Sequence, residues 1–269
     1  MHINIPKDSL YYKAIVSYQG THFHGWQSQK NNITIQDTIE STLYKIFNFH
    51  QRIIGASRTD AGVHAYGQVF SFYAPAAIIQ DKLLLLINHN LPDTIMIHHL
   101  EKINTNFHPR FHAIKKTYQY LISKEKLSPA INFFILHYQK SFDITIFKNC
   151  CQIFFGTHDF KSFCTLDENK NTIRTIYNID IESINNIYII TIIGNGFLRY
   201  MIRRLLGAAL YAATKKINIH YIENILKSTL ANNQLLTLPA KGLLLKNIVY
   251  DENQDIDTKN PFLANFNFY

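Results

Sequence analysis

The segment from Ser57 to Ala65 holds the densest set of chemically versatile side chains in the sequence. It places the carboxylate of Asp60 two residues from the guanidinium of Arg58, with the conformationally permissive Gly62 close behind. Active-site side chains are often carried on such loops, because rigid strands on either side hold them in place. Asp and Gly are also common in ordinary hairpin turns. The residues alone therefore leave a catalytic loop and a plain turn both open.

Basic pairs recur along the chain. Arg199 and Arg203 are four residues apart beside an apolar stripe, which predicts that they share one face of a helix. Such residues are candidate phosphate contacts, although a solvated surface explains any single pair as well. The pairs are Lys115–Lys116, Arg203–Arg204 and Lys215–Lys216.

The charge balance favours a polyanionic partner. Lys and Arg number 27 against 19 Asp and Glu, which gives a net charge of +8, and the isoelectric point is near 9.2. Nucleic acid is the first candidate for such a chain, although a surplus of charge for solubility is the alternative. A hydrophobic content of 47% with 17% charged residues excludes an intrinsically disordered chain. Apolar runs stay well short of a membrane span, so no membrane association is expected.

Cysteine and histidine give no sign of a metal centre. The three cysteines include no C-x-x-C pair, which favours free thiols in a reducing, cytoplasmic setting. We also expect no secretory signal, since the N-terminus lacks an apolar core segment. His108 and His112 have a metal-like spacing but no acidic ligand near them. We therefore expect no metal. His22 and His24, close to Trp26, are better suited to stacking or phosphate contact.

Periodicity predicts an α+β fold with mostly antiparallel sheets. The likeliest boundary lies near residues 104–113, giving an N-terminal half of 1–106 and a C-terminal half of 107–269. Helices are expected at 33–47, 78–90, 144–154, 198–209 and 220–230. Strands are expected at 11–18, 52–57, 68–73, 94–99, 117–123, 172–183, 187–193 and 243–250.

Seven motifs in order resemble those of the tRNA pseudouridine synthase A family. The likeness spans nearly the whole chain, except for the termini, and includes the R-T-D-A-G-V-H-A signature at residues 58–65. Gln19 and Ser57 depart from the usual pattern, since the family more often has Asp and a small residue there. The other matching segments are Gly20–Gln27, Ile87–Pro92, Phe107–Phe111 with Tyr118–Tyr120, Gly156–Phe163, Gly196–Arg203 and Pro239–Leu243.

The resemblance implies a fold and an activity. It implies two related ferredoxin-like (RRM-like) halves, with mostly antiparallel sheets that form a central basic catalytic cleft. The activity implied is isomerisation of uridine to pseudouridine at positions 38, 39 and 40 in the anticodon stem-loop of tRNA. No cofactor is implied. A cytoplasmic homodimer is implied, with one tRNA spanning both subunits.

The resemblance also assigns roles to four residues. Asp60 takes the position of the catalytic acid, acting as nucleophile or base. Tyr118 matches the tyrosine that stacks on the target base, whereas Tyr120, two residues on, is expected in the core. Arg58 matches the residue that contacts the displaced base and its phosphates. Arg203 matches the ion-pair partner of Asp60, which would keep that carboxylate ionised.

Two other functions stay open at this point. A non-catalytic RNA-binding module of the same fold would keep the basic surface and lose turnover. A nuclease-like acid–base enzyme would cleave RNA instead of isomerising it. The presence of Asp60, Tyr118 and Arg203 together argues against the first alternative. The lack of a paired His or second acid in the key loop argues weakly against the second.

Overall fold

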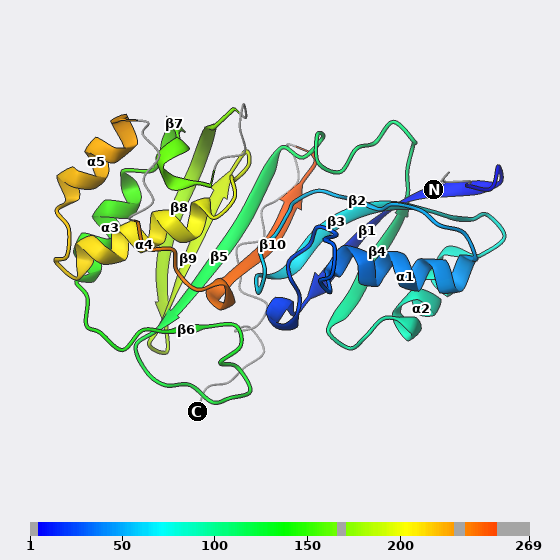
Figure 1. Cartoon of the computed structure of the whole chain (residues 1–269), viewed down its shortest axis with the longest axis horizontal. Helices are drawn as coiled ribbons and strands as arrows, with labels where there is room; N and C mark the ends of the chain where they lie inside the picture. Colours follow the sequence, from blue (N-terminus) through cyan, green and yellow to red (C-terminus); the bar gives the residue numbers. More distant parts are fainter. Residues whose placement is uncertain (1–4, 166–170, 229–234, 252–269) are drawn as a thin grey trace. The chain divides into compact units, whose positions relative to one another are not determined.

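The chain forms two compact units. The computed structural model describes residues 5–165, 171–228 and 235–251. Among these, the first unit contains residues 5–114 and 244–251, and the second contains residues 115–243. Each unit combines strands and helices, as Figure 1 shows. The expected α+β class is therefore confirmed.

The first unit is built around strand β1 (Ser9–Tyr18). β1 lies between β3 (His64–Pro75) and β4 (Ile95–Lys102) and pairs antiparallel with both. The short β2 (Ile54–Gly55) pairs with β3. Aromatic and β-branched residues are frequent in β1 and β3, as the pleated surface of a half-buried sheet favours.

The first unit contains two helices, which pack against each other (Figure 1). Helix α1 (Ile35–Phe47) begins where the Oγ1 of Thr34 accepts the Asp37 backbone N–H at 3.2 Å, an N-cap of the usual kind. Its face of Ile35, Ile39 and Leu43 is fully buried. Helix α2 (Gln80–Asn90) buries Leu83 and Ile87 and packs on β4.

The second unit has its own mostly antiparallel sheet. β5 (Lys115–Ser123) pairs with β9 (Ile187–Gly194), β9 with β8 (Ile173–Ile184), and β8 with β7 (Gly156–Asp159). The short β6 (Leu136–His137) lies parallel to β5. Asn185 and Asn186 both have positive φ and make the tight turn between β8 and β9. The helices of this unit are α3 (Ile144–Gln152), α4 (Met201–Ala213) and α5 (Ile219–Ser228).

The last strand returns to the first unit. β10 (Leu243–Val249) pairs in parallel with β3, with Leu244 opposite His64 and Leu245 opposite Ala65. The two units therefore divide the chain at 114/115 and again at 243/244. This division differs from two consecutive halves at 106/107, because the pairing of a late strand with an early one leaves no local pattern in the sequence.

Most predicted elements are found within three residues of their expected ends, and three differ. The strand expected at 68–73 begins four residues earlier, at His64. The helix expected at 220–230 is α5, and residues 229 and 230 lie outside the described residues. The strand expected at 52–57 is reduced to β2, since the chain leaves β3 at Gly55 to form the loop before His64. The helix expected at 198–209 begins at Met201 and ends four residues later than expected, at Ala213. Arg199 therefore precedes α4, and it does not share a helix face with Arg203 as predicted.

Three short 3-10 turns complete the described elements. They are η1 (Gly20–His22), η2 (Lys161–Phe163) and η3 (Ala240–Gly242). Cys150, Cys151 and Cys164 are free and buried. Within the described ranges, every helix is too short or too polar to cross a bilayer.

Candidate active site

Asp60 lies on a tight turn between β2 and β3. Its carbonyl oxygen accepts the N–H of Val63 at 3.1 Å, which closes the turn. Gly62 has a φ of +77°, a conformation that other residues rarely adopt. The neighbour Thr59 is buried, whereas Asp60 is half-buried and Arg58 is exposed. The buried threonine thus anchors the loop between two charged side chains that stay accessible.

A second loop, residues 20–26, holds the Asp60 turn from the side. The N–H of Trp26 donates to the Thr59 carbonyl at 3.1 Å, and the N–H of Gly62 donates to the Phe23 carbonyl at 3.2 Å. Gly25 approaches so closely that a Cβ there would lie 2.5 Å from the Thr59 carbonyl oxygen. Backbone contacts therefore hold the two loops against each other.

Side chains from β1 and β3 complete the support of the Asp60 turn. The hydroxyls of Tyr18 and Thr59 are hydrogen-bonded at 2.8 Å. The amide of Gln68 donates to the Ser57 carbonyl at 2.7 Å and accepts the Ser57 N–H at 3.2 Å. His64 Nδ1 accepts the N–H of Gly20 at 3.1 Å, so this nitrogen is unprotonated.

Tyr18 and Gln68 were missed by the sequence analysis. Each lies on a strand that the sequence predicts, close to the end that faces the loop. Nothing in the local pattern separates these polar strand residues from solvent-facing ones. Their burial, with Gln68 fully inaccessible, is a property of the tertiary structure only.

Tyr118 lies in the middle of β5, opposite Ile192 of β9. Its side chain is buried, and its ring and that of Phe197 are nearly perpendicular, with ring centres 5.3 Å apart and an interplanar angle of 81°. Phe197 belongs to the motif that leads into α4, so this motif fixes the orientation of the Tyr118 ring.

Tyr120 is a core residue, as the sequence analysis expects. It is fully buried, and its hydroxyl donates to the carbonyl of Pro239 at 2.7 Å. Burial strongly raises the pKa of this phenol, an effect that the positive charge of Arg203 partly offsets. Tyr120 is therefore protonated throughout the physiological range and serves as a structural hydrogen-bond donor.

Arg203 lies in the first turn of α4 and is half-buried. Its Nε donates to the carbonyl of Leu238 at 2.6 Å, and the Leu238 N–H donates back to the Arg203 carbonyl at 3.2 Å. This reciprocal pair locks the orientation of the guanidinium. Because Nε is engaged, a carboxylate partner of Arg203 would bind the terminal nitrogens.

Tyr200 is a positioning feature that the sequence analysis missed. It immediately precedes α4 and has a φ of +62°, an uncommon conformation for an aromatic residue. The guanidinium carbons of Arg199, Arg203 and Arg204 lie 4.9, 5.2 and 5.9 Å from the centre of its ring. Arg204 is further fixed by the Cys164 carbonyl at 2.5 Å. Three guanidinium groups thus lie within cation–π distance of the Tyr200 ring.

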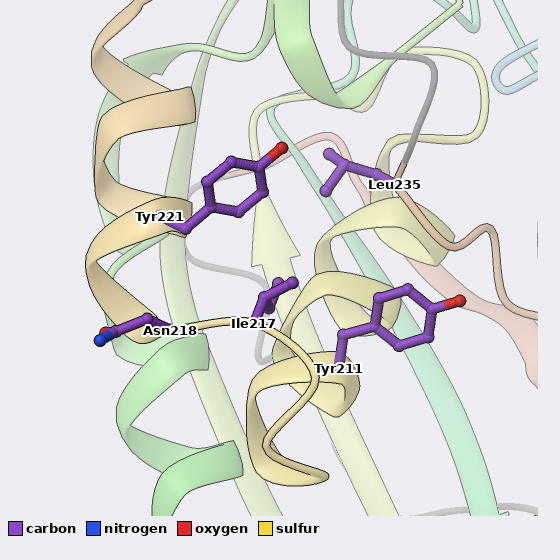
Figure 2. A pocket seen from close by; sticks show the side chains of 5 residues that line it. All are labelled: Tyr211, Ile217, Asn218, Tyr221 and Leu235. Carbon is purple, nitrogen blue, oxygen red and sulfur yellow. The ribbon is translucent and has the colours of Figure 1, made fainter.

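An open pocket of about 340 Å³ lies elsewhere in the second unit. Figure 2 shows the rings of Tyr211, from α4, and Tyr221, from α5, with Ile217 between them. Asn218 and Leu235 complete the lining, and the ammonium of Lys216 lies 4.7 Å from the centre of the Tyr211 ring. The sequence-predicted site residues are absent from this lining, so the pocket is not assigned to the chemistry.

The four predicted site residues are divided between the units. Arg58 and Asp60 share one loop of the first unit, and Tyr118 and Arg203 belong to the second unit. Across residues 5–165, 171–228 and 235–251, His, Cys, Asp and Glu form no group of three or more suited to a metal ion.

Comparison with known proteins identifies the family. A profile described as tRNA pseudouridine synthase matches residues 14–112 and 150–251. The tRNA pseudouridine synthase A of Thermoanaerobacter sp. (strain X514) is 36% identical over 238 residues, covering 88% of this chain and 98% of that protein. The enzymes of the same name from Thermodesulfovibrio yellowstonii and Caldicellulosiruptor bescii are 35% and 38% identical, covering 88% and 87% of this chain and 98% and 97% of theirs. The chain therefore belongs to the tRNA pseudouridine synthase family, whose members isomerise uridine to pseudouridine in tRNA.

Proposed function

We propose that this enzyme forms pseudouridine at positions 38, 39 and 40 of the anticodon stem-loop of tRNA. The observation that carries the proposal is the Asp60 turn, whose backbone is held on both sides while its carboxylate stays accessible. The relatives named tRNA pseudouridine synthase A match this chain along almost their whole length. A net charge of +8 suits a substrate as acidic as tRNA.

The reaction breaks the bond between C1′ and N1 of uridine and forms a bond between C1′ and C5. The proton at C5 is lost and N1 gains one, so substrate and product contain the same atoms and the same electrons. No oxidant or reductant is consumed, and we expect no cofactor. The reaction does require a carboxylate that acts as nucleophile or base, and Asp60 is the proposed group. Attack at C1′, attack at C6 and removal of a 2′ proton are the three possible routes.

Arg58 is proposed to contact the displaced base and its phosphates. It is exposed and stands directly beside the buried anchor Thr59. Extruding a stacked base costs a few kcal/mol, and a planar guanidinium can fill the gap that the base leaves. The fixed backbone at Thr59 gives Arg58 a defined starting point for this contact.

Tyr118 and Arg203 are proposed to complete the site. Tyr118 would stack on the target uracil and assist proton transfer at C5. Arg203 would form an ion pair with Asp60 through its terminal nitrogens. A guanidinium within about 4–6 Å lowers the pKa of a carboxyl group by about 1–3 units, which would keep Asp60 ionised.

We further propose that the enzyme is a cytoplasmic homodimer and that one tRNA contacts both subunits. The likeness to the family supports both the dimer and the location. The free buried cysteines at positions 150, 151 and 164 support the cytoplasmic location only. Sedimentation of the protein with and without tRNA measures the stoichiometry. A monomer that binds tRNA one to one would refute the dimer.

The activity is tested by incubating the protein with an unmodified tRNA transcript that has uridine at positions 38–40, followed by nucleoside analysis. Pseudouridine at these positions with intact strands is the expected result. Binding without conversion would favour the non-catalytic RNA-binding module, and strand cleavage would favour the nuclease. A transcript with cytidine at 38–40 is the matched control, and pseudouridine formed elsewhere in it would refute the position assignment.

A further inference from the structure

The loop from Phe107 to His112 is held by several hydrogen bonds and ring contacts, and the proposed reaction assigns it no role. Phe107 and Pro109 anchor its base. The hydroxyl of Tyr250 donates to the Pro109 carbonyl at 2.8 Å, and the rings of Tyr250 and Phe107 are 5.1 Å apart. Lys13 adds to this anchor, since its ammonium lies 5.8 Å from the Phe107 ring centre and 5.7 Å from that of Tyr250.

His108 fixes the outer part of the loop. Its Nδ1 accepts the N–H groups of Arg110 and Phe111 at 3.2 and 3.3 Å. The N–H of His112 donates to the His108 carbonyl at 3.0 Å. One imidazole therefore closes the turn that an Asx side chain closes elsewhere. The conformation of the outer loop residues is set before any partner arrives.

The loop holds an aromatic ring out into solvent. Phe111 is 74% exposed, the most exposed large apolar side chain among the described residues. The imidazole of His108 lies against it with ring centres 4.2 Å apart, and the guanidinium of Arg110 lies 6.0 Å from its centre. Arg110 and His112 are exposed as well. A single exposed apolar residue needs no explanation, but an exposed ring with an imidazole and a guanidinium beside it is a candidate contact surface.

We propose that this loop is an RNA-binding platform, in which the ring of Phe111 stacks on an unpaired nucleobase of the tRNA and Arg110 contacts a neighbouring phosphate. Bases stack on aromatic side chains regardless of sequence, since every base has a π-face. Phosphate contacts supply affinity and orientation. Because the loop is already ordered, little conformational entropy is lost when it binds. The inference rests on the proposed function only in taking tRNA as the ligand.

The test measures the affinity of an unmodified tRNA transcript for loop variants at several salt concentrations. Removal of a stacking ring costs about 1–3 kcal/mol per base, so Phe111→Ala is expected to raise Kd by about 5- to 150-fold. The slope of log K against log salt should not change, because no charge is lost. Phe111→Trp should bind at least as tightly as the wild type, and Phe111→Leu should resemble Phe111→Ala.

Two controls come from helix α2, which carries an exposed Leu85 and an exposed Lys82. Leu85→Ala removes a side chain that is 71% exposed and should leave Kd unchanged. Arg110→Gln should reduce the magnitude of the salt slope by about 1. If Lys82→Gln reduces it equally, the effect of Arg110 is general electrostatics and the phosphate contact is refuted.

Three outcomes would overturn the stacking proposal. The first is a Phe111→Ala variant with wild-type Kd, and the second is a Phe111→Leu variant with full affinity. The third is a Phe111→Ala variant that sediments as a smaller species than the wild type. That result would make Phe111 part of an interface between two copies of the chain. Wild-type conversion of the same transcript is measured in parallel. If wild-type protein converts the transcript and the Phe111 variants bind normally, the platform fails while the proposed function stands.

Discussion

Gly25 and Thr59 are in backbone contact, and this contact joins the two loops that form the Asp60 site. The α-carbon of Gly25 faces the Thr59 carbonyl at a distance that leaves no room for a side chain. One residue on, the N–H of Trp26 donates to that same carbonyl at 3.1 Å. The position of Asp60 therefore depends on a residue 35 positions earlier in the chain.

Gly25→Ala should disrupt both loops. The added Cβ would lie 2.5 Å from the Thr59 oxygen, and the φ of +87° is unfavourable for alanine. A left-handed conformation alone costs about 1–2 kcal/mol. We expect the melting temperature to fall by several degrees and the residual folded protein to lose most of its pseudouridine synthesis. The matched control is Gly196→Ala, because a Cβ there would lie 3.6 Å from Arg174, an ordinary contact. Equal melting temperatures for the two variants would contradict the prediction.

Asp60→Asn should abolish turnover and preserve the fold. The change keeps nearly the same volume, but an amide cannot act as nucleophile or base, so the rate should fall by orders of magnitude. Loss of one negative charge from a protein that binds RNA should leave affinity unchanged or slightly improved. Melting, tRNA binding and pseudouridine are measured on one preparation. A variant that still works within about tenfold of the wild-type rate would show that Asp60 is not the catalytic acid.

The ring of Tyr200 is expected to support turnover by orienting Arg203. A cation–π contact contributes about 0.5–2 kcal/mol, so Tyr200→Leu is expected to lower kcat by about 2- to 30-fold through loss of Arg203 orientation. Tyr200→Phe keeps the ring and should restore kcat. Tyr200→Gly relieves the left-handed strain at φ +62° yet lacks the ring, so it should lower kcat as Tyr200→Leu does. If the glycine variant were fully active, the ring would have no positioning role.

Binding of tRNA should depend steeply on salt. Each phosphate that the protein neutralises adds about −0.7 to −0.9 to the slope of log K against log salt. The protein has a net charge of +8 and several basic pairs. We therefore expect several phosphate contacts, whose slopes add to a steep total. Fluorescence anisotropy between low and moderate salt measures the slope. A flat line would remove the argument that charge draws this protein to RNA.

The loop that carries Phe111 should loosen as pH falls. The pKa of His108 lies below the ordinary 6.5, chiefly because of burial. A backbone hydrogen bond of His108 partly offsets this shift, and the nearby charges of His112 and Arg110 add to it. The neutral ring that holds the loop is thus favoured in the folded state. Its contribution to stability is present above pH 6.5 and is lost as pH falls through the lower native pKa.

Nuclear magnetic resonance tests the His108 prediction directly. The amide resonances of Arg110 and Phe111 should titrate together with the His108 ring, since their N–H groups donate to it. The amide of Ala130, which donates to Ser128 instead, serves as the reference. A His108 titration at or above pH 6.5 would contradict the lowered pKa.

The class of fold and the family were both predictable from the amino-acid sequence. Strands such as Ser9–Tyr18 and helices such as Ile35–Phe47 were predictable, because alternation and helical spacing report burial on one face. The Thr34 cap and the Asn185–Asn186 turn were equally local. The R-T-D-A-G-V-H-A motif marked the loop of Asp60, and the order of seven motifs identified the relatives.

The residues that support the site could be identified only from the folded structure. Gln68, Tyr18 and Tyr200 look like unremarkable polar or aromatic residues in the sequence, and their roles arise from partners that are distant in the chain or from an unusual backbone angle. The pairing of β10 with β3 joins residues about 180 positions apart. Local patterns report which face of an element is buried. They carry no record of the partner that buries it, and that partner is what holds Asp60 in place.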